Sequence, residues 1–468
     1  MIRRRPLALL LALSLGTALG QAVPALPPGQ ALPSGFAPPR GAGDSIYPGL
    51  GDPGLDVTHY DLSLKTDPGS DQIEGRAVLS VTARSDLSQI GLDFAGPVAS
   101  EVLLDEQPAR FVQAGEKLLI LPPQPLRAGT RFTLSVAYRG KPAAPLDPDL
   151  GIRLGWIATP GGSYTLSEPN AAHGYFPCDD LPADGASFTL HLDVPDGYTA
   201  VASGVQTGQR REGGRSVTDF ELPQETATYA LGIQIGKLEL APRPSAGAVL
   251  LRDAFPAALP AAVRAPFART PEMLELLQSW FGPYPFAVYG VAVAPDPGFP
   301  PLETATLSTF PSRAEGETVA LHELSHQWFG DSLRLGDWSD IWLNEGFATY
   351  AEALWAEHLG QDSAALIRRW DAALSHSPVR PLVAASASQL FDQTSYLRGA
   401  LALHALRRSA GDEGFRAVLH AYVSRYAGHS ARTQDFLEVV REVAGQRALE
   451  AIQPWVFSAT LPPLPPPS

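Results

Sequence analysis

Apolar and polar residues alternate one by one in several short runs in the first half of the chain. Residues 60–64, 132–138 and 188–194 form three such runs. Because successive side chains of a strand point to opposite faces, this period of two predicts strands with one buried face. Turn residues separate the runs, so the sequence predicts an all-β domain at residues 49–238.

The second half of the chain has the start and stop signals of helices instead. Thr270-Pro271 are favoured at the start of a helix, and Gly282 is favoured just past its end. Apolar residues recur at helical intervals from 314 to 329 and again from about 340 to 359. The pattern also predicts helix through almost all of residues 363–457, so the second domain is expected to be mainly α-helical.

Two histidines and a glutamate in the predicted helices have the spacing of metal ligands. The chain contains His322-Glu323-Leu324-Ser325-His326, and Glu345 follows nineteen residues after His326. Helical residues four apart lie on one face, so both imidazoles can reach one ion, and Glu345 on the next helix can complete a catalytic zinc site. Glu323 is rotated away from the ligand face of the helix, so it lies beside the ion without binding it. There it can accept a proton from water. The sequence therefore predicts one zinc per chain.

Charge and cysteine content narrow the possible partners. The 468 residues include 49 acidic and 35 basic side chains, for a formal net charge of −14. Such an acidic chain is a poor partner for nucleic acids or anionic membranes. Cys178 is the only cysteine, so the chain forms no intramolecular disulfide, and we expect a buried thiol.

The N-terminus has the three parts of a secretory signal. Residues 3–5 are arginines, residues 7–15 are apolar, and Ala18-Leu19-Gly20 resembles a cleavage site. We therefore expect residues 1–20 to be a signal peptide and the protein to be exported, either periplasmic or extracellular. A retained membrane anchor is the alternative, because the two kinds of segment overlap in length. No membrane insertion is expected once the signal is removed, since no other apolar run approaches membrane length.

Proline-rich segments flank the two predicted domains. Residues 21–48 are rich in Pro, Gly and Ala and predict a flexible linker. Residues 462–468, at the other end, form a Pro-rich tail that is expected to be extended or disordered.

The sequence around the metal motif resembles the aminopeptidase N family of zinc metallopeptidases. The resemblance rests on residues 322–331 and 342–348, and it extends to Tyr175-Phe176-Pro177-Cys178-Asp179 and over most of residues 52–463. It implies an α+β multidomain fold, with an antiparallel, saddle-like β-domain followed by a thermolysin-like, mainly α-helical catalytic domain at residues 239–461. Many members also have a large helical C-terminal domain, so the chain resembles a short form with a more open cleft.

The resemblance also assigns roles to three further residues. Glu303 stands where the family binds the α-amino group of the substrate, although its flanks Leu302 and Thr304 depart from the family's Gly-x-Met-Glu-Asn. Glu168 resembles the second ligand of that amino group. Tyr396 resembles the tyrosine that donates a hydrogen bond to the oxyanion of the reaction.

The resemblance implies a secreted zinc aminopeptidase that acts on peptides with free N-termini and uses Glu323 as general base. Asp340 and Asn344 are close to the ligands in sequence, so they are candidates for orienting them. A thermolysin-like zinc endopeptidase and a catalytically silent peptide-binding protein stay open as alternatives. The sequence does not predict the oligomeric state.

Overall fold

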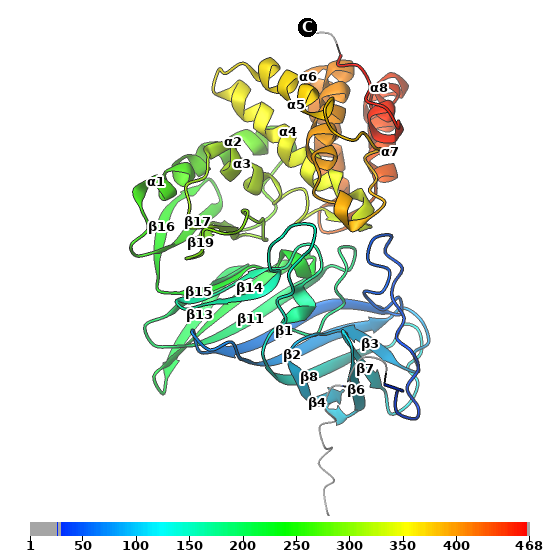
Figure 1. Cartoon of the computed structure of the whole chain (residues 1–468), viewed down its shortest axis with the longest axis vertical. Helices are drawn as coiled ribbons and strands as arrows, with labels where there is room; N and C mark the ends of the chain where they lie inside the picture. Colours follow the sequence, from blue (N-terminus) through cyan, green and yellow to red (C-terminus); the bar gives the residue numbers. More distant parts are fainter. Residues whose placement is uncertain (1–25, 27–29, 466–468) are drawn as a thin grey trace, which may run out of the picture.

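The computed structural model describes Leu26 and residues 30–465 of the chain (Figure 1). The expected signal peptide, residues 1–20, therefore lies outside the described residues. The start of the expected linker and the last three residues of the tail also lie outside them. Within the described part of the chain, no helix combines the length and the apolar character needed to cross a membrane.

The first domain is built on an eight-stranded sheet. Its strands follow one another in space in this order: β13 (Val205–Glu212), β14 (Arg215–Thr226), β11 (Ala186–Pro195), β1 (Leu55–Thr66), β2 (Ile73–Ala83), β8 (Arg131–Gly140), β4 (Val98–Leu104) and β5 (Gln107–Pro108). All neighbours are antiparallel except β1 and β11, which run parallel. The three alternating runs of the sequence lie in β1, β8 and β11, which confirms these strand predictions.

Two smaller sheets complete this domain. One contains β3 (Ile90–Asp93), β7 (Lys117–Leu121) and β6 (Arg110–Ala114), and the other contains β12 (Thr199–Ala202), β15 (Ile233–Gly236), β10 (Gly162–Leu166) and β9 (Gly155–Thr159). Every residue of β10 is buried, and the strand ends two residues before Glu168. The predicted thiol of Cys178 is free and buried in this domain, as expected.

The second domain begins with a five-stranded sheet and continues as helices. The strands are β16 (Leu238–Ala246), β17 (Val249–Pro256), β18 (Val288–Tyr289), β19 (Val291–Val293) and β20 (Ser308–Phe310). The helices are α1 (Ala261–Arg264), α2 (Thr270–Phe281), α3 (Glu317–Ser325), α4 (Trp342–His358), α5 (Ser363–Leu374), α6 (Gly399–Tyr426), α7 (Thr433–Ala444) and α8 (Gln446–Phe457). Figure 1 shows α4–α8 stacked at one end of the molecule and the β-domain at the other, with α1–α3 next to the five-stranded sheet. The predicted fold class, a β-domain followed by a mainly helical catalytic domain, is confirmed.

Two helix predictions were too long. The helix expected at 314–329 ends at Ser325, because the following turn tightens: the Trp328 N–H donates to the Ser325 carbonyl at 3.1 Å, and Gly330 adopts a φ of 127°. The helix expected through 363–457 is interrupted after α5, where the sequence contains two prolines before residue 382. Both differences matter, because each places a site residue at an irregular helix end.

Part of the expected linker is bound to the helical domain. The Ser45 N–H and hydroxyl both donate to Asp337 Oδ2, at 3.1 and 3.0 Å. Asp44 Oδ2 accepts from the Trp338 N–H at 2.8 Å, just before α4 begins. Figure 1 shows this dark blue segment rising from the β-domain towards the helices. The described end of the linker therefore ties the two domains together.

Candidate metal centre and active site

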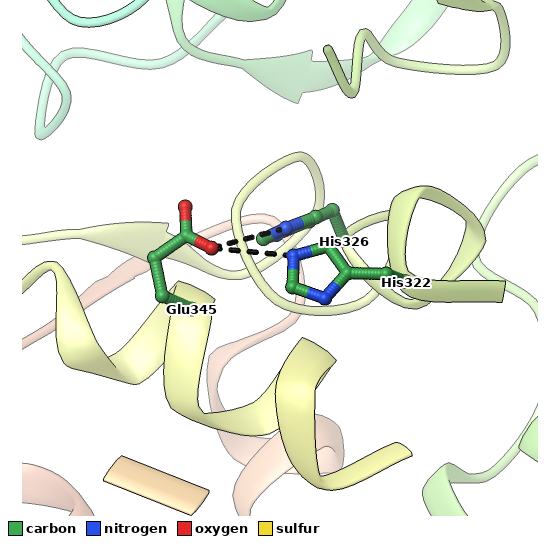
Figure 2. A group of neighbouring side chains, drawn as sticks. All are labelled: His322, His326 and Glu345. Atoms are coloured by element: carbon green, nitrogen blue, oxygen red, sulfur yellow. Dashed lines mark hydrogen bonds and ion pairs between the residues drawn. The ribbon is translucent and has the colours of Figure 1, made fainter. Parts of the chain in front are cut away.

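The helices α3 and α4 bring the predicted metal ligands together. His322 lies in the last turn of α3, His326 directly follows α3 with helical backbone angles, and Glu345 lies in the first turn of α4. Glu345 Oε2 lies 3.3 Å from His322 Nε2 and 3.7 Å from His326 Nε2. Figure 2 shows the carboxylate facing both imidazoles.

These three side chains fit a zinc ion. Ligand atoms within 4.8 Å of one another could share one metal, and all three are buried. Zinc bound tetrahedrally at about 2.0–2.2 Å separates its ligand atoms by roughly 3.4 Å. The distances of 3.3 and 3.7 Å lie close to that edge length. Two imidazoles and one carboxylate also leave a fourth position open, as catalytic zinc sites do.

The outer nitrogen of each imidazole has its own partner. His322 Nδ1 lies 3.1 Å from Glu352 Oε1, and His326 Nδ1 lies 3.1 Å from the Phe329 carbonyl oxygen. A hydrogen bond at Nδ1 fixes the ring orientation and leaves Nε2 as the metal-binding atom. Sequence reasoning missed Glu352. Its spacing was visible, because a residue seven positions after Glu345 lies on the same face of α4.

The two residues expected to orient the ligands do something else. Asp340 Oδ1 accepts from the Thr433 hydroxyl at 2.5 Å, and the Asn344 side-chain amide donates to the Tyr229 hydroxyl at 3.3 Å. Neither hydrogen-bonds to a predicted ligand within the described residues, so these contacts give no support to an orienting role. Proximity in sequence is a poor guide here, because residues adjacent on a helix point about 100° apart.

Three further glutamates line the same small cavity, which has a volume of about 100 Å³. Carboxylate oxygens of Glu168, Glu303 and Glu345 lie within 4.8 Å of one another. Glu303, Glu323 and His326 form a second group with ligand atoms within the same distance. Glu168 comes from the β-domain and Glu303 from the catalytic domain, so the cavity lies between the domains. The structure thus brings together every carboxylate that the sequence assigned to metal, base or substrate.

Glu168 and Glu303 each have an unsatisfied oxygen. The side chains are buried, and Oε1 of each has no hydrogen-bond partner among the described residues. Burial raises the pKa of both carboxyls well above the usual range. The negative charge of Glu345 adds to the rise at Glu168, and the charge of Glu168 adds to the rise at Glu303. Buried anionic groups without partners are costly, so this end of the cavity is built for a cation.

The same crowding acts on the proton-transfer candidates. Burial raises the pKa of Glu323 to about 8, and the negative charge of Glu345 adds to this effect. Burial alone would lower the pKa of His322, but hydrogen bonds to Glu345 and Glu352 raise it well above its ordinary value. In the metal-free protein, protons therefore occupy the site where a metal ion would otherwise balance the charge.

Tyr396 covers the metal ligands from a separate element. It lies in a short π-helix, Thr394–Arg398, and its ring stacks on His322 with centroids 6.0 Å apart. Burial raises the pKa of the phenol well above its usual value, so the hydroxyl stays protonated and can donate a hydrogen bond. Arg398 holds this segment in place, because its buried guanidinium donates to the carbonyl oxygens of Trp455 and Arg380.

The remaining wall of the cavity is apolar. It includes Leu150, Ile152, Leu154, Leu166, Leu302 and Phe391. Leu166 and Leu302 directly adjoin the segments that carry Glu168 and Glu303. An apolar side chain next to a bound cationic group would therefore lie against this wall.

Two family models match the chain. The model described as the peptidase M1 N-terminal domain matches residues 57–230, and the model described as the peptidase family M1 domain matches residues 302–455. The second match includes the predicted zinc ligands, Glu303 and Tyr396.

Named relatives extend these matches. Aminopeptidase B from Rattus norvegicus is 28% identical over 447 residues, covering 83% of this chain, and the Homo sapiens protein is 28% identical over 432 residues, covering 84%. The aligned regions span 66% and 63% of these longer proteins, so the chain represents about two thirds of their length or less.

Solved structures match more of their own length. An M1 zinc metallopeptidase from Deinococcus radiodurans superposes with a TM-score of 0.88 at 45% identity, covering 92% of this chain and 100% of that one. A mutant of that protein bound to a Tyr-Ser-Ala substrate superposes equally well.

We predict that Glu352→Ala weakens zinc binding about ten- to a hundredfold, because His322 loses the partner that orients its ring. Titration of the metal-free protein with zinc against a chromophoric chelator measures this affinity. Glu357→Ala on the same helix is the matched control, since Glu357 pairs with Arg407 away from the site. Equal zinc affinities for the two variants would contradict the role of Glu352.

Proposed function

Because the chain belongs to peptidase family M1, a family of zinc metallopeptidases, we propose that it is an aminopeptidase that removes the first residue from peptides with free N-termini. One observation carries this proposal. The buried oxygens of Glu168 and Glu303 that accept no hydrogen bond from the described residues lie beside the three-residue metal set. A peptide ammonium satisfies both oxygens through charge-assisted hydrogen bonds, which are stronger than neutral ones.

The ammonium site fixes which bond is cut. With the amino group held between Glu168 and Glu303, only the first peptide bond can reach the metal ligands a few ångströms away. The side chain of the first residue then faces the apolar wall that contains Leu302 and Phe391. The charge of the amino group therefore decides which peptide bond is cut. The apolar wall favours substrates whose first residue has an apolar side chain.

The proposed chemistry divides among a few side chains. His322, His326 and Glu345 would hold zinc, which when bound supplies a Lewis acid that acidifies water and polarises the scissile carbonyl. Glu323 accepts the proton from the attacking water and returns it to the departing amine. The Tyr396 hydroxyl donates a hydrogen bond to the carbonyl oxygen as its negative charge grows.

The two alternative functions have less support. An endopeptidase of the thermolysin type has no use for two buried carboxylates at the end of its cleft, yet Glu168 and Glu303 converge there. A silent binding protein would be expected to lack a ligand or the base, but His322, His326, Glu345 and Glu323 are all present.

We expect the enzyme to cleave a tripeptide such as Leu-Ser-Ala with a free N-terminus and to leave its N-acetylated form almost uncut. Acetylation removes the charge that the two glutamates bind, so kcat/KM should fall about a hundredfold or more. Mass spectrometry of the products measures both rates. Amidation of the C-terminus is the control and should change the rate little. Equal cleavage of free and acetylated peptides would favour the endopeptidase.

We expect Glu323→Gln to bind one zinc and to lose kcat by about 10²- to 10⁴-fold, because the amide cannot accept the proton. Metal analysis of the purified variant and single-turnover kinetics test the two parts separately. Turnover close to that of the original protein would remove Glu323 from the mechanism.

Export of the enzyme belongs to the same proposal and rests on the charged, apolar and small residues within positions 1–20. We expect the protein outside the cytoplasm to begin at Gln21, which N-terminal sequencing can check. Recovery of the protein in the membrane fraction with residues 1–20 still attached would instead support a retained membrane anchor.

A further inference from the structure

The loop that carries Glu303 is attached on two sides. On the β-domain side, the Ala305 N–H donates to the Ala230 carbonyl oxygen at 2.8 Å, and the Gly204 N–H donates to the Thr306 hydroxyl at 2.8 Å. On the other side, the loop faces the residues that follow α3. Its position relative to the metal ligands therefore depends on contacts made at that second side.

The backbone of Gly290 supports the loop on that side, since its N–H donates to the Thr306 carbonyl oxygen at 3.1 Å. A buried amide makes the contacts between the loop and the residues that follow α3. Gln327, the residue after the ligand His326, is fully buried. Its Oε1 accepts from the Thr306 N–H at 2.7 Å and from the Tyr284 hydroxyl at 3.2 Å. Its Nε2 donates to the Thr304 carbonyl oxygen at 3.2 Å and to Asp331 Oδ2 at 2.7 Å. Two of these four bonds reach the loop directly after Glu303.

The loop needs this support because its backbone is strained. Thr306 has a φ of 67°, in the left-handed region that a β-branched residue rarely adopts. Such a conformation costs roughly 1–3 kcal/mol and persists only where the surroundings hold it in place. The hydrogen bond that the Thr306 N–H donates to Gln327 Oε1 is one of the contacts that hold it.

We propose that Gln327 is a positioning residue that sets the distance between the ammonium site and the metal ligands. It joins the chain directly after His326 to the loop directly after Glu303, so the two parts of the site move as one unit. This inference rests on the proposed aminopeptidase function, because it assigns Gln327 the task of placing Glu303 against the substrate's amino group.

The position of Gln327 gives its loss a distinct signature. Gln327 touches neither the proton acceptor Glu323 nor the hydroxyl of Tyr396 in any hydrogen bond of the described residues. Its removal should therefore weaken peptide binding and leave the chemical step largely intact. An interaction that binds the ground state and the transition state alike changes KM and spares kcat.

The test is Gln327→Met, which keeps the volume of the side chain and removes its four hydrogen bonds. We expect KM for a free tripeptide to rise about ten- to a hundredfold, with kcat within about threefold and one zinc still bound. The preference for the free over the acetylated peptide should fall by a similar factor. Ser325→Ala is the matched control, because among the described residues its buried hydroxyl donates only to the Leu321 carbonyl oxygen, within α3.

A double-mutant cycle with Glu303→Gln shows whether Gln327 acts through Glu303. If it does, Gln327→Met should change KM much less in the Glu303→Gln background than in the original protein. Full additivity of the two changes would overturn the proposal, and so would a KM equal to that of Ser325→Ala.

Hydrogen exchange separates failure of this inference from failure of the proposed function. Gln327→Met should speed amide exchange in residues 303–307 relative to Ser325→Ala, whether or not the protein is an aminopeptidase. Unchanged exchange in that segment would refute the positioning role. Faster exchange in a protein that cleaves no free peptide would refute the proposed function and keep Gln327 as the residue that holds the loop.

Discussion

The burial of several carboxylates around one small cavity is the constraint on which the rest of the site depends. Glu168, Glu303, Glu323 and Glu345 all lie at its walls. A buried carboxylate is costly as an uncompensated anion, so burial raises the pKa values of Glu168, Glu303 and Glu323 and favours the entry of cations. In the proposed function, a zinc ion at the histidine end and a peptide ammonium at the other end would supply that compensation. The cost of burying these carboxylates thus favours both the binding of the catalytic metal and the binding of the substrate's amino group.

The fold meets this constraint by drawing the groups from rigid elements of both domains. Glu168 follows a buried strand of the β-domain, while the metal ligands come from α3 and α4 of the helical domain. Their relative position depends on the interface between the two domains. There Ser45 donates a hydrogen bond to Asp337, and the loop after Glu303 donates one to the Ala230 carbonyl oxygen. Hydrogen bonds between the domains therefore decide the geometry of the site as much as those within it.

Local spacing predicted the parts of the site that local structure determines. His322, His326 and Glu345 followed from helical periodicity, and the three alternating runs followed from strand periodicity. Glu168, Glu303 and Tyr396 needed the resemblance to a family, because their meeting is purely tertiary. The same limit explains why Asp340 and Asn344, chosen for their nearness in sequence, face Thr433 and Tyr229 instead, and why Gln327 was missed. Contacts across a turn or between domains leave no period in the sequence.

Proton release on zinc binding tests the central claim most directly. Calorimetric titration of the metal-free protein at pH 7 in buffers of different ionisation enthalpy counts the protons displaced. The account predicts release of at least one proton per zinc, because the hydrogen bonds of His322 with Glu345 and Glu352 and the burial of Glu323 keep protons in the empty site. Zinc binding that is independent of the buffer would contradict it, since the buried carboxylates would then be charged and stable without a cation.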